Sequence, residues 1–365
     1  MKRLSLALLP CLLVVVLAGL FVPPTFAHGA VPSLTTCGKG WTVVPSANRS
    51  NYFGNELSSV AAISANDIWA VGASWQRFEV IPDMDQSLIE HWNGTAWSIV
   101  PDASPTDTDL NGVAGVATND VWAVGRDYTS QTQNAVIEHW NGTAWSLVPT
   151  PASNGSELKA VAAISATDVW AVGDRASGSL IMHWNGTVWS IVPDPSSPPY
   201  LYAVAAVSST DVWAGGGGDG TPTIEHWNGK NWKVVSSPYE SSSFFSAISA
   251  VSATDIWAVG FNEGDRYWSF IEHWDGERWT SVRVGQWESL FAVGAISENN
   301  VWAAGLLKAG DSIVHWNGKK WSIVPGPPVP NPVYSAFTVV PGTAQLWGVG
   351  SSSSNPYKTL IAFHC

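Results

Sequence analysis

The stretch from Asp67 to Val100 reads DIWAVG, then a variable segment, then LIEHWNGTAWSIV. Within it, Asn93-Gly94 separates two runs that are rich in β-branched and aromatic residues. A two-residue Asn-Gly link favours a tight hairpin, because both positions tolerate a positive φ. We therefore predict that LIEHW and TAWSIV are antiparallel neighbours, that DIWAVG pairs with LIEHW, and that SSVAAIS at 58–64 is a further strand. These four strands make one sheet.

The same unit recurs along the whole chain at intervals of 43 to 53 residues. The tryptophan of DIWAVG occurs in seven copies, at Trp69, Trp122, Trp170, Trp213, Trp257, Trp302 and Trp347. The histidine of LIEHW also occurs in seven copies, at His91, His139, His183, His226, His273, His315 and His364. Four short strands per repeat at this period are typical of a β-propeller. We predict an all-β, seven-bladed β-propeller with four antiparallel strands in each blade.

The two ends of the chain carry parts of one blade. Gly38–Pro45 (GKGWTVVP) matches Gly94–Pro101 (GTAWSIVP), and the last repeat stops after its third strand. An N-terminal fourth strand that completes the last sheet would leave no open edge. Cys365 then falls on the position of Trp92, which directly precedes the position of Cys37. We expect a disulfide between the two cysteines in place of the missing peptide bond, and two unpaired thiols are the alternative.

Residues 1–27 have the composition of a secretory signal peptide. Lys2 and Arg3 precede a mainly apolar run, and the final TFA suits a signal peptidase. An uncleaved membrane anchor is the alternative, because the run approaches the minimum length of a span. We predict a signal peptide at 1–27, a short tail at 28–36 and the propeller at 37–365, in a protein that is secreted or held at the cell surface. No later segment is apolar enough to span a membrane.

The net charge of the chain bears on which class of macromolecule it can bind. Without residues 1–27, the chain holds 15 basic and 29 acidic residues. A net negative charge of this size argues against a nucleic acid partner, because the phosphate backbone requires a basic surface.

Polar residues inside the repeat are of the types that act as general acids and bases or bind metals. Glu-His-Trp occurs at 90–92, 138–140, 225–227 and 272–274. Groups that repeat in every blade are spread around the ring and cannot converge on one substrate, so we interpret the histidines as half-buried structural residues with polar partners. An Asp or Asn opens each of the first six second strands and is expected to cap a tight turn. These residues are Asp67, Asp120, Asp168, Asp211, Asp255 and Asn300.

Function is expected where the repeat is interrupted. The variable insertions lie between second and third strands and between blades, and both sets of loops lie on the same face of a propeller. Aromatic rings beside amide and carboxylate groups are typical of carbohydrate sites. The candidate ligand-binding residues are Trp75, Phe78, Tyr128, Lys159, Tyr202, Arg266, Tyr267 and Trp268. Alternatively, these rings pack the loops against the blades.

A second group of residues is expected at the mouth of the central channel. One residue near the start of each first strand belongs to it: Ser58, Asn111, Lys159, Tyr202, Ser246, Phe291 and Ser335. Lys159 is the only charged member of this ring, and Asp109 and Glu157 are close to ring members in the sequence. A solvated lysine is the alternative interpretation.

One motif suggests a metal. Residues 107–112 read DTDLNG, which fits the opening of a calcium loop with oxygen ligands from Asp107, Asp109 and Asn111. The closing carboxylate is missing, because the twelfth place is a threonine. Calcium is therefore a minor hypothesis, and we expect no other cofactor.

The motifs DVWAVG and IEHWNGTAWS, between Cys37 and Cys365, resemble those of tandem-repeat propellers in secreted bacterial proteins. The architecture is similar to that of kelch and WD40 propellers, although the kelch Gly-Gly doublet is not repeated and the WD40 Trp-Asp ending is missing. The resemblance implies the fold. For function we favour a secreted, monomeric, non-catalytic binding module for a carbohydrate or a protein. The alternative is an enzyme, a lyase or a hydrolase, that acts on extracellular polysaccharide at the channel mouth.

Overall fold

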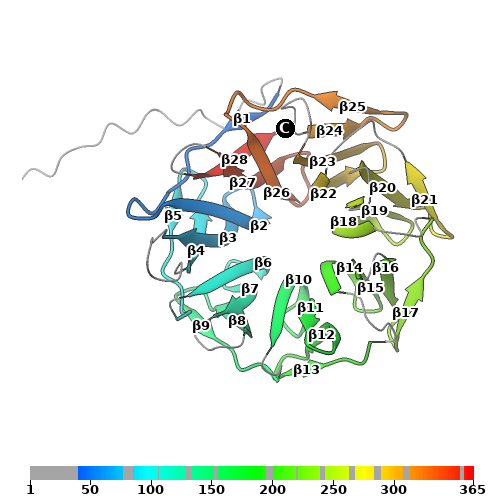
Figure 1. Ribbon diagram of the computed structural model, residues 1–365, viewed down its shortest axis with the longest axis horizontal. Coiled ribbons are helices and arrows are strands. Elements are labelled where there is room, and N and C mark those ends of the chain that lie inside the picture. Colours follow the sequence, from blue (N-terminus) through cyan, green and yellow to red (C-terminus); the bar gives the residue numbers. More distant parts are fainter. Residues whose placement is uncertain are drawn as a thin grey trace, which may run out of the picture. The chain divides into compact units, whose positions relative to one another are not determined.

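Seven four-stranded antiparallel sheets surround a central axis in the computed structural model (Figure 1). The described residues all belong to the unit Ser33–Cys365. They are residues 40–76, 85–105, 107–128, 133–151, 155–194, 200–218, 221–238, 243–262, 268–282, 289–306, 313–353 and 357–365. None of these segments contains a helix that is long and apolar enough to cross a membrane. The predicted all-β, seven-bladed propeller is confirmed.

Each of the first four blades is a meander of four consecutive strands. The first blade consists of β2 (Gly54–Ser64), β3 (Asp67–Trp75), β4 (Asp85–Trp92) and β5 (Trp97–Ile99). The second consists of β6 (Thr108–Ala117), β7 (Asp120–Asp127), β8 (Asn134–Trp140) and β9 (Trp145–Leu147). The third consists of β10 (Ser156–Ser165), β11 (Asp168–Arg175), β12 (Gly178–Trp184) and β13 (Trp189–Ile191). The fourth consists of β14 (Tyr200–Ser208), β15 (Asp211–Gly218), β16 (Thr221–Trp227) and β17 (Trp232–Val235).

The last three blades follow the same order, except that the seventh takes a strand from the other end of the chain. The fifth consists of β18 (Ser243–Ser252), β19 (Asp255–Asn262), β20 (Trp268–Trp274) and β21 (Trp279–Val282). The sixth consists of β22 (Ser289–Ser297), β23 (Asn300–Leu306), β24 (Ile313–Trp316) and β25 (Trp321–Val324). The seventh consists of β26 (Pro332–Val339), β27 (Leu346–Ser352), β28 (Lys358–His364) and β1 (Thr42–Val43), and β1 pairs with β28.

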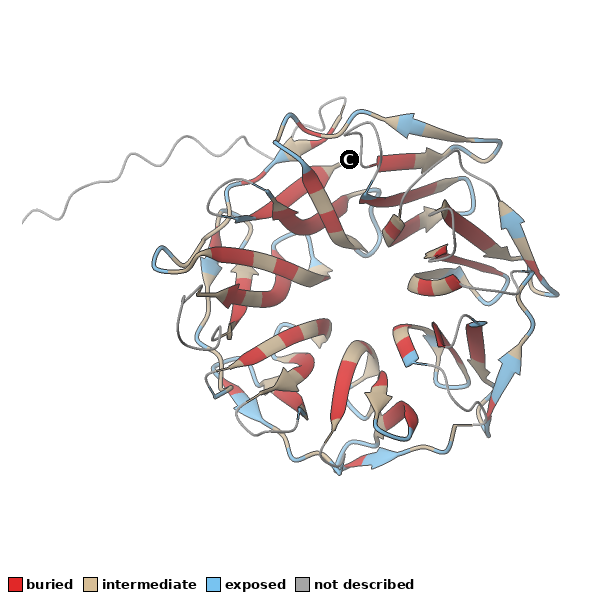
Figure 2. Cartoon of the chain, in the orientation of Figure 1, coloured by how far each residue is buried: buried red, intermediate tan, exposed pale blue. Residues whose placement is uncertain are grey.

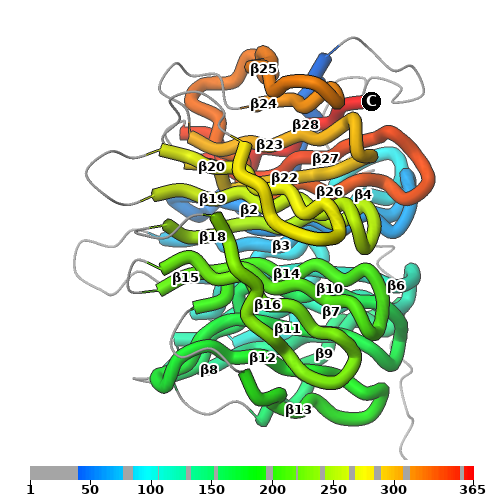
Figure 3. The backbone as a smooth tube through the Cα atoms, turned by 90° about the vertical axis from the view of Figure 1, so that its right-hand side faces the viewer, coloured from blue at the N-terminus to red at the C-terminus, as the bar shows by residue number. Residues whose placement is uncertain are grey.

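The first strand of every blade lies nearest the axis (Figure 1). Neighbouring first strands contact each other around the ring, and β26 of the seventh blade contacts β2 of the first. The strands run between two opposite faces, as the side view in Figure 3 shows. We call the face where first strands begin and second strands end the mouth face. In the first blade, Gly54 at the start of β2 pairs with Trp75 at the end of β3 on this face.

The opposite face carries the turns between third and fourth strands. Gly94 has a φ of 89°, and the Oδ1 atom of Asn93 accepts hydrogen bonds from the N–H groups of Thr95 and Ala96. The Asn93 side chain thus provides hydrogen-bond acceptors for the backbone N–H groups of the turn. The predicted Asn-Gly hairpin is confirmed. Equivalent bonds recur at Asn141, Asn185, Asn228, Asp275 and Asn317.

Tryptophan side chains fill the space between neighbouring blades. Trp69 of the first blade lies 5.0 Å from Trp140 and 5.4 Å from Trp145 of the second blade, measured between ring centroids. The fourth-strand ring meets Trp69 edge to face, which aromatic pairs prefer over direct stacking. Between the sixth and seventh blades, the ring centroids of Trp41 and Trp302 lie 5.6 Å apart in the same edge-to-face arrangement. Trp41 therefore does the packing of a fourth-strand tryptophan, as the sequence match predicted.

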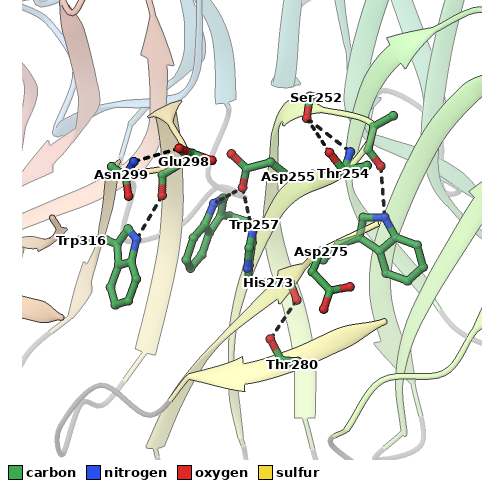
Figure 4. Close-up of polar contacts among 12 residues, drawn as sticks. Ser252, Thr254, Asp255, Trp257, His273, Asp275, Thr280, Glu298, Asn299 and Trp316 are labelled. Atoms are coloured by element: carbon green, nitrogen blue, oxygen red, sulfur yellow. Dashed lines mark hydrogen bonds and ion pairs between the residues drawn. The ribbon is translucent and has the colours of Figure 1, made fainter. Parts of the chain in front are cut away.

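Polar side chains connect the second and third strands within a blade. In the fifth blade, Asp255 Oδ1 accepts a hydrogen bond from Trp257 at 2.9 Å and lies 2.7 Å from His273 Nε2 (Figure 4). The histidines are thus structural, as predicted. The expected role of Asp255 was wrong, because its carboxylate binds these two rings rather than capping the turn. In that turn, the Ser252 hydroxyl accepts from the N–H of Thr254 instead.

A buried glutamate on the third strand holds the segment that links two blades. Glu90 is fully buried and accepts hydrogen bonds from the Ser46 hydroxyl at 2.9 Å and from the N–H of Ala47 at 3.2 Å. Glu138 binds Ala103 and Ser104 in the same way. Figure 2 shows burial concentrated in the middle strands of each blade, whereas the short fourth strands include exposed residues.

The register of the seventh blade corrects the alignment of its last residues. His364 pairs with Leu346, and this is the position that Trp92 holds opposite Ile68 in the first blade. His364 was therefore wrongly assigned to the histidine series, whose position Phe363 occupies opposite Trp347. Cys365 is accordingly one position further along the blade than expected. Cys37 lies outside the described residues.

Candidate functional site

Every first strand contains a β-bulge near the mouth face. In the third blade, Leu158 and Ala160 pair with Gly173 and Val172, so Lys159 is an extra residue without a pairing partner in β11. The same shift leaves one residue out of the pairing in each of the other six blades. The seven bulge residues are Ser58, Asn111, Lys159, Tyr202, Ser246, Phe291 and Ser335. They are the ring of residues that the sequence placed at the channel mouth.

The glycine that ends the DVWAVG motif makes room for this bulge. A Cβ atom on Gly173 would lie 2.0 Å from the carbonyl oxygen of Glu157, just before the bulge. The corresponding glycines of the other blades would bring a Cβ to between 1.8 and 2.0 Å of a first-strand carbonyl oxygen. Since bulges redirect side chains, the repeated glycine is what allows one side chain per blade to turn toward the axis.

All seven bulge residues line one cavity of about 710 Å³, which we call the mouth pocket. Because the bulge position differs from blade to blade, a nearly symmetric scaffold has an asymmetric lining. One wall is charged and the other is aromatic. The aromatic wall consists of Tyr200, Tyr202, Phe244, Phe245, Phe261 and Phe291.

The charged wall is a network that joins the second and third blades. Glu157 Oε2 lies 2.9 Å from Arg126 Nη1 and 2.7 Å from Lys159 Nζ, and Glu157 Oε1 accepts from the Asn111 amide at 2.9 Å. Arg126 Nη2 also lies 3.2 Å from Asp109 Oδ2. The side chain of Glu157 is only 5% exposed, so these bonds hold its charge inside the wall.

Two titratable groups beside this network have shifted pKa values. Burial raises the pKa of Glu56, and the negative charge of Asp109 raises it further. Burial also raises the pKa of Tyr128 to about 12, and its hydroxyl donates to Asp109 at 3.3 Å. Tyr128 therefore stays a neutral donor, and its ring lies 4.6 Å from the Arg126 guanidinium carbon.

The aromatic wall belongs to the fourth, fifth and sixth blades. Tyr202 meets Phe244 edge to face at 6.4 Å, and Phe261 meets Phe291 edge to face at 5.7 Å. Phe244 and Phe261 are neighbours at 5.9 Å. Tyr202, Phe244, Phe261 and Phe291 form a continuous, partly buried surface that we call the aromatic cup, whereas Phe245 is fully buried.

A second cavity of about 390 Å³ adjoins the mouth pocket. It shares Glu56, Ser58 and Asn111 with the mouth pocket, so the two cavities are neighbours. Its remaining lining residues are Ala73, Trp75, Asp85 and Asp109.

The structure brings together some of the candidate ligand-binding residues and separates others. Lys159 and Tyr202 line the mouth pocket, Trp75 lines the adjoining cavity, and Tyr128 lies in the charged network. The Trp75 ring also packs on Gly54, where an added Cβ would approach it to 2.1 Å. Trp268 lies apart, packed against the core of the fifth blade. Phe78, Arg266 and Tyr267 lie outside the described residues.

The residues of the calcium motif have other contacts. Asp107 has a φ of 72°, and its N–H donates to the Asp85 carbonyl at 2.7 Å. Asp109 binds Arg126, and the Asn111 amide donates to Glu157. Across the described part of the chain, His, Cys, Asp and Glu form no group of three that could hold a metal ion. Calcium binding remains a prediction.

Sequence reasoning missed Glu56, Arg126 and the phenylalanines of the fifth blade as parts of the site. Phe244 and Phe261 look like ordinary strand residues, and only the pairing of β18 with β19 places them side by side. The available signal was the glycine of DVWAVG, because its repetition at one position indicates a close approach of backbone.

Comparisons with known proteins show the fold but no family. No protein-family model matches the chain, and no curated protein matches it. A solved structure of YCF48 bound to D1 peptide is similar, with 13% identity and a TM-score of 0.60 over 92% of this chain and 99% of that one. The structure of U3-55K is also similar, with 11% identity and a TM-score of 0.62 over 89% of this chain and 98% of that one. The Cps50 (Swd1) propeller domain of Myceliophteria thermophila is similar as well, with 11% identity and a TM-score of 0.55 over 88% of this chain and 98% of that one. The architecture is that of WD40-like and kelch-like propellers.

Proposed function

We propose that this propeller is a binding module that recognises a segment of another polypeptide in the mouth pocket. The observation that carries the proposal is the convergence of seven bulge residues, of five different types, on one cavity. The scaffold positions repeat from blade to blade, whereas the bulge position is serine, asparagine, lysine, tyrosine or phenylalanine. Variation at the positions that face one cavity is typical of a recognition site on a rigid scaffold.

The lining favours a polypeptide over a carbohydrate. Sugars are bound by flat, accessible rings, but Trp75 is packed on Gly54 and Trp268 is packed in its blade. The aromatic cup instead presents edges and faces of several rings at different angles, which suits an apolar side chain. The similarity to a structure of YCF48 bound to D1 peptide is in keeping with this class of ligand.

A direct test is selection from a library of random 12-residue peptides displayed on phage. We expect the wild-type protein to enrich a family of peptides, and Phe291→Ala to bind them less tightly by about 2 kcal/mol, or about thirtyfold in Kd. Val188→Ala serves as the control, because Val188 is 54% exposed in the turn between β12 and β13, on the face opposite the mouth face. Failure to enrich any peptide, with a glycan array positive, would replace this proposal by the carbohydrate alternative.

A catalytic role is the second candidate, and Glu56 is the observation that favours it. This carboxyl group lines both cavities, and its raised pKa favours the protonated form that a general acid requires. If the protein cleaves extracellular polysaccharide, Glu56→Gln should abolish release of reducing or unsaturated ends while leaving the melting temperature unchanged. No turnover of a polysaccharide panel by the wild type would exclude this candidate.

We also propose that the protein is secreted as a monomer after removal of residues 1–27, with a disulfide between Cys37 and Cys365. The pairing of β1, which follows Cys37 in the chain, with β28, which ends just before Cys365, supports this bond. Mass spectrometry of the secreted protein, before and after reduction and alkylation, tests both the cleavage site and the bond. Light scattering tests the monomer.

A further inference from the structure

We infer that the Asn-Gly turns on the face opposite the mouth face are modification sites, at which asparagine is hydrolysed to aspartate or isoaspartate when the tip of the hairpin opens. Five turns between third and fourth strands contain this pair, and we call them the outer turns. They lie at 93–94, 141–142, 185–186, 228–229 and 317–318. All five belong to the described residues, and the asparagine of each is exposed. The inference is independent of what the mouth pocket binds.

The reaction consumes only water. In the first blade, the backbone nitrogen of Gly94 attacks the side-chain amide carbon of Asn93, a C–N bond forms, and ammonia leaves with the proton of that nitrogen. Water then opens the cyclic imide at either of its two carbonyl groups, which gives aspartate or isoaspartate. Glycine favours the attack, because it has no Cβ atom and its backbone is free to approach the amide carbon.

The geometry of the turn requires this reactive pair. Gly94 has a φ of 89°, and a Cβ atom on it would lie 2.8 Å from the Oδ1 atom of Asn66. Asn93 is needed for its side-chain oxygen, which accepts hydrogen bonds from the N–H groups of Thr95 at 2.9 Å and Ala96 at 3.1 Å. Only a residue with the same acceptor can replace the asparagine without weakening the turn.

The same two hydrogen bonds hold the asparagine in an unreactive orientation. The attack requires the amide group of Asn93 to rotate toward the nitrogen of Gly94, so both bonds must break. The equivalent bonds of the other four outer turns measure between 2.9 and 3.1 Å. Loss of two bonds predicts that each outer turn reacts at least about tenfold more slowly in the folded protein than in the unfolded chain.

An outer turn can open without disturbing the rest of its blade. In the first blade, β5 is three residues long, pairs with β4 through three residue pairs, and is the last strand of its sheet. Trp97 is buried, whereas Asn93 and Thr95 at the tip are exposed. Segments with few buried contacts open locally far more often than the whole protein unfolds. We therefore expect the reaction to follow local opening.

Another Asn-Gly pair, Asn111-Gly112, lies within β6 and provides an internal reference. The Asn111 amide donates to Glu157 Oε1 and to the Leu158 carbonyl, both at 2.9 Å, and Gly112 pairs with Val124. These contacts join the second blade to the third. Asn111 should therefore react only when a larger part of the ring unfolds.

The fifth blade indicates which product the turn accepts. Asp275 stands where the other outer turns have asparagine, and its Oδ1 atom accepts from the N–H groups of Arg278 and Glu277 at 2.9 Å each. These bonds lower the pKa of Asp275, because they stabilise its carboxylate. Aspartate should therefore keep the turn and add a negative charge to this face. Isoaspartate adds a carbon atom to the backbone and should disrupt the turn.

The experiment compares conversion rates in the full chain with and without enough urea to unfold it. Both samples are kept in mildly alkaline buffer, and peptide mapping by mass spectrometry detects the gain of about 1 Da at each converted site. At the outer turns of the native protein, we expect rates at least about tenfold below those in urea and at least about tenfold above that of Asn111. In urea, Asn93 and Asn111 should convert at similar rates. Hydrogen exchange of the N–H groups that donate to each asparagine should rank the outer turns in the same order as conversion does.

Two results would overturn the inference. Equal rates in the native and the unfolded chain would mean that the turn does not restrain its asparagine. Native rates no higher at the outer turns than at Asn111 would mean that the reaction requires global unfolding.

Two variants test the fate of the product. Asn93→Asp should keep the melting temperature of the wild type, whereas Asn93→Ala should lower it, because alanine has no side-chain acceptor. An equal loss in both variants would contradict the claim that aspartate fits the turn.

Discussion

The repeated glycine of the second strand offers the sharpest test of how the site is built. In Gly173→Ala, the new Cβ would lie 2.0 Å from the Glu157 carbonyl oxygen and 2.8 Å from the Leu158 Cα atom. The first of these distances is shorter than an ordinary 3.4 Å contact by about 1.4 Å, and backbone cannot rotate out of the way as a side chain can. We expect a loss of about 3 kcal/mol, made up of overpacking and weakened bonds between β10 and β11.

The assay is urea denaturation, followed by tryptophan fluorescence, with Gly326→Ala as the matched control. The nearest atom to a Cβ on Gly326 is Ile313 Cδ1 at 3.7 Å, so this substitution should change the free energy of unfolding by less than about 0.5 kcal/mol. Gly173→Ala should also weaken peptide binding, because it displaces Lys159 from the mouth pocket. If Gly173→Ala is as stable as Gly326→Ala and binds as the wild type does, then the bulge is not what positions the pocket residues.

Three further predictions concern charge and cross-linking. Burial raises the pKa of Glu90 from 4.5 to about 7, so the folded state holds a proton that the unfolded state has lost, and stability should fall by up to about 3 kcal/mol as the pH rises from 4.5 through 7. Glu90→Gln should make this fall smaller, and an unchanged pH profile would refute the assignment. Arg126→Met should cost about 2 kcal/mol, because it leaves Glu157 and Asp109 with fewer partners, whereas Arg278→Met at an exposed 4.0 Å pair should be silent. Equal effects of the two arginine variants would contradict this. Cys365→Ser should lower the free energy of unfolding by roughly 5 kcal/mol if a disulfide joins Cys37 to Cys365. Treating this variant with a reducing agent should then cause no further loss of stability.

The architecture was predictable because its signals are local and repeated. The Asn-Gly pairs define the turns, and the match of Trp41 with Trp97 identifies the strand that joins the last sheet. The packing of Trp41 against Trp302 at 5.6 Å follows from that match. Seven copies of one pattern leave little freedom in the number of blades.

The lining of the site was predictable only in part. The positions of Lys159 and Tyr202 follow from where each first strand begins, but their projection into the pocket depends on a bulge that the sequence signals only through a glycine one strand away. The bond between Arg126 and Glu157 joins two blades and has no local signal at all. The role of Asp255 was misjudged for a related reason, since a turn cap and a partner for Trp257 and His273 require the same residue type.

Photo-cross-linking is the most direct test of whether the seven bulge residues form the binding site, because it identifies the surface that the ligand touches. A benzophenone amino acid would replace Phe291 in one variant and Val188 in another, and each would be irradiated with a peptide selected by the wild type. We expect a covalent adduct from position 291 and none from position 188. An adduct from position 188 with none from position 291 would show that the seven bulge residues do not form the binding site.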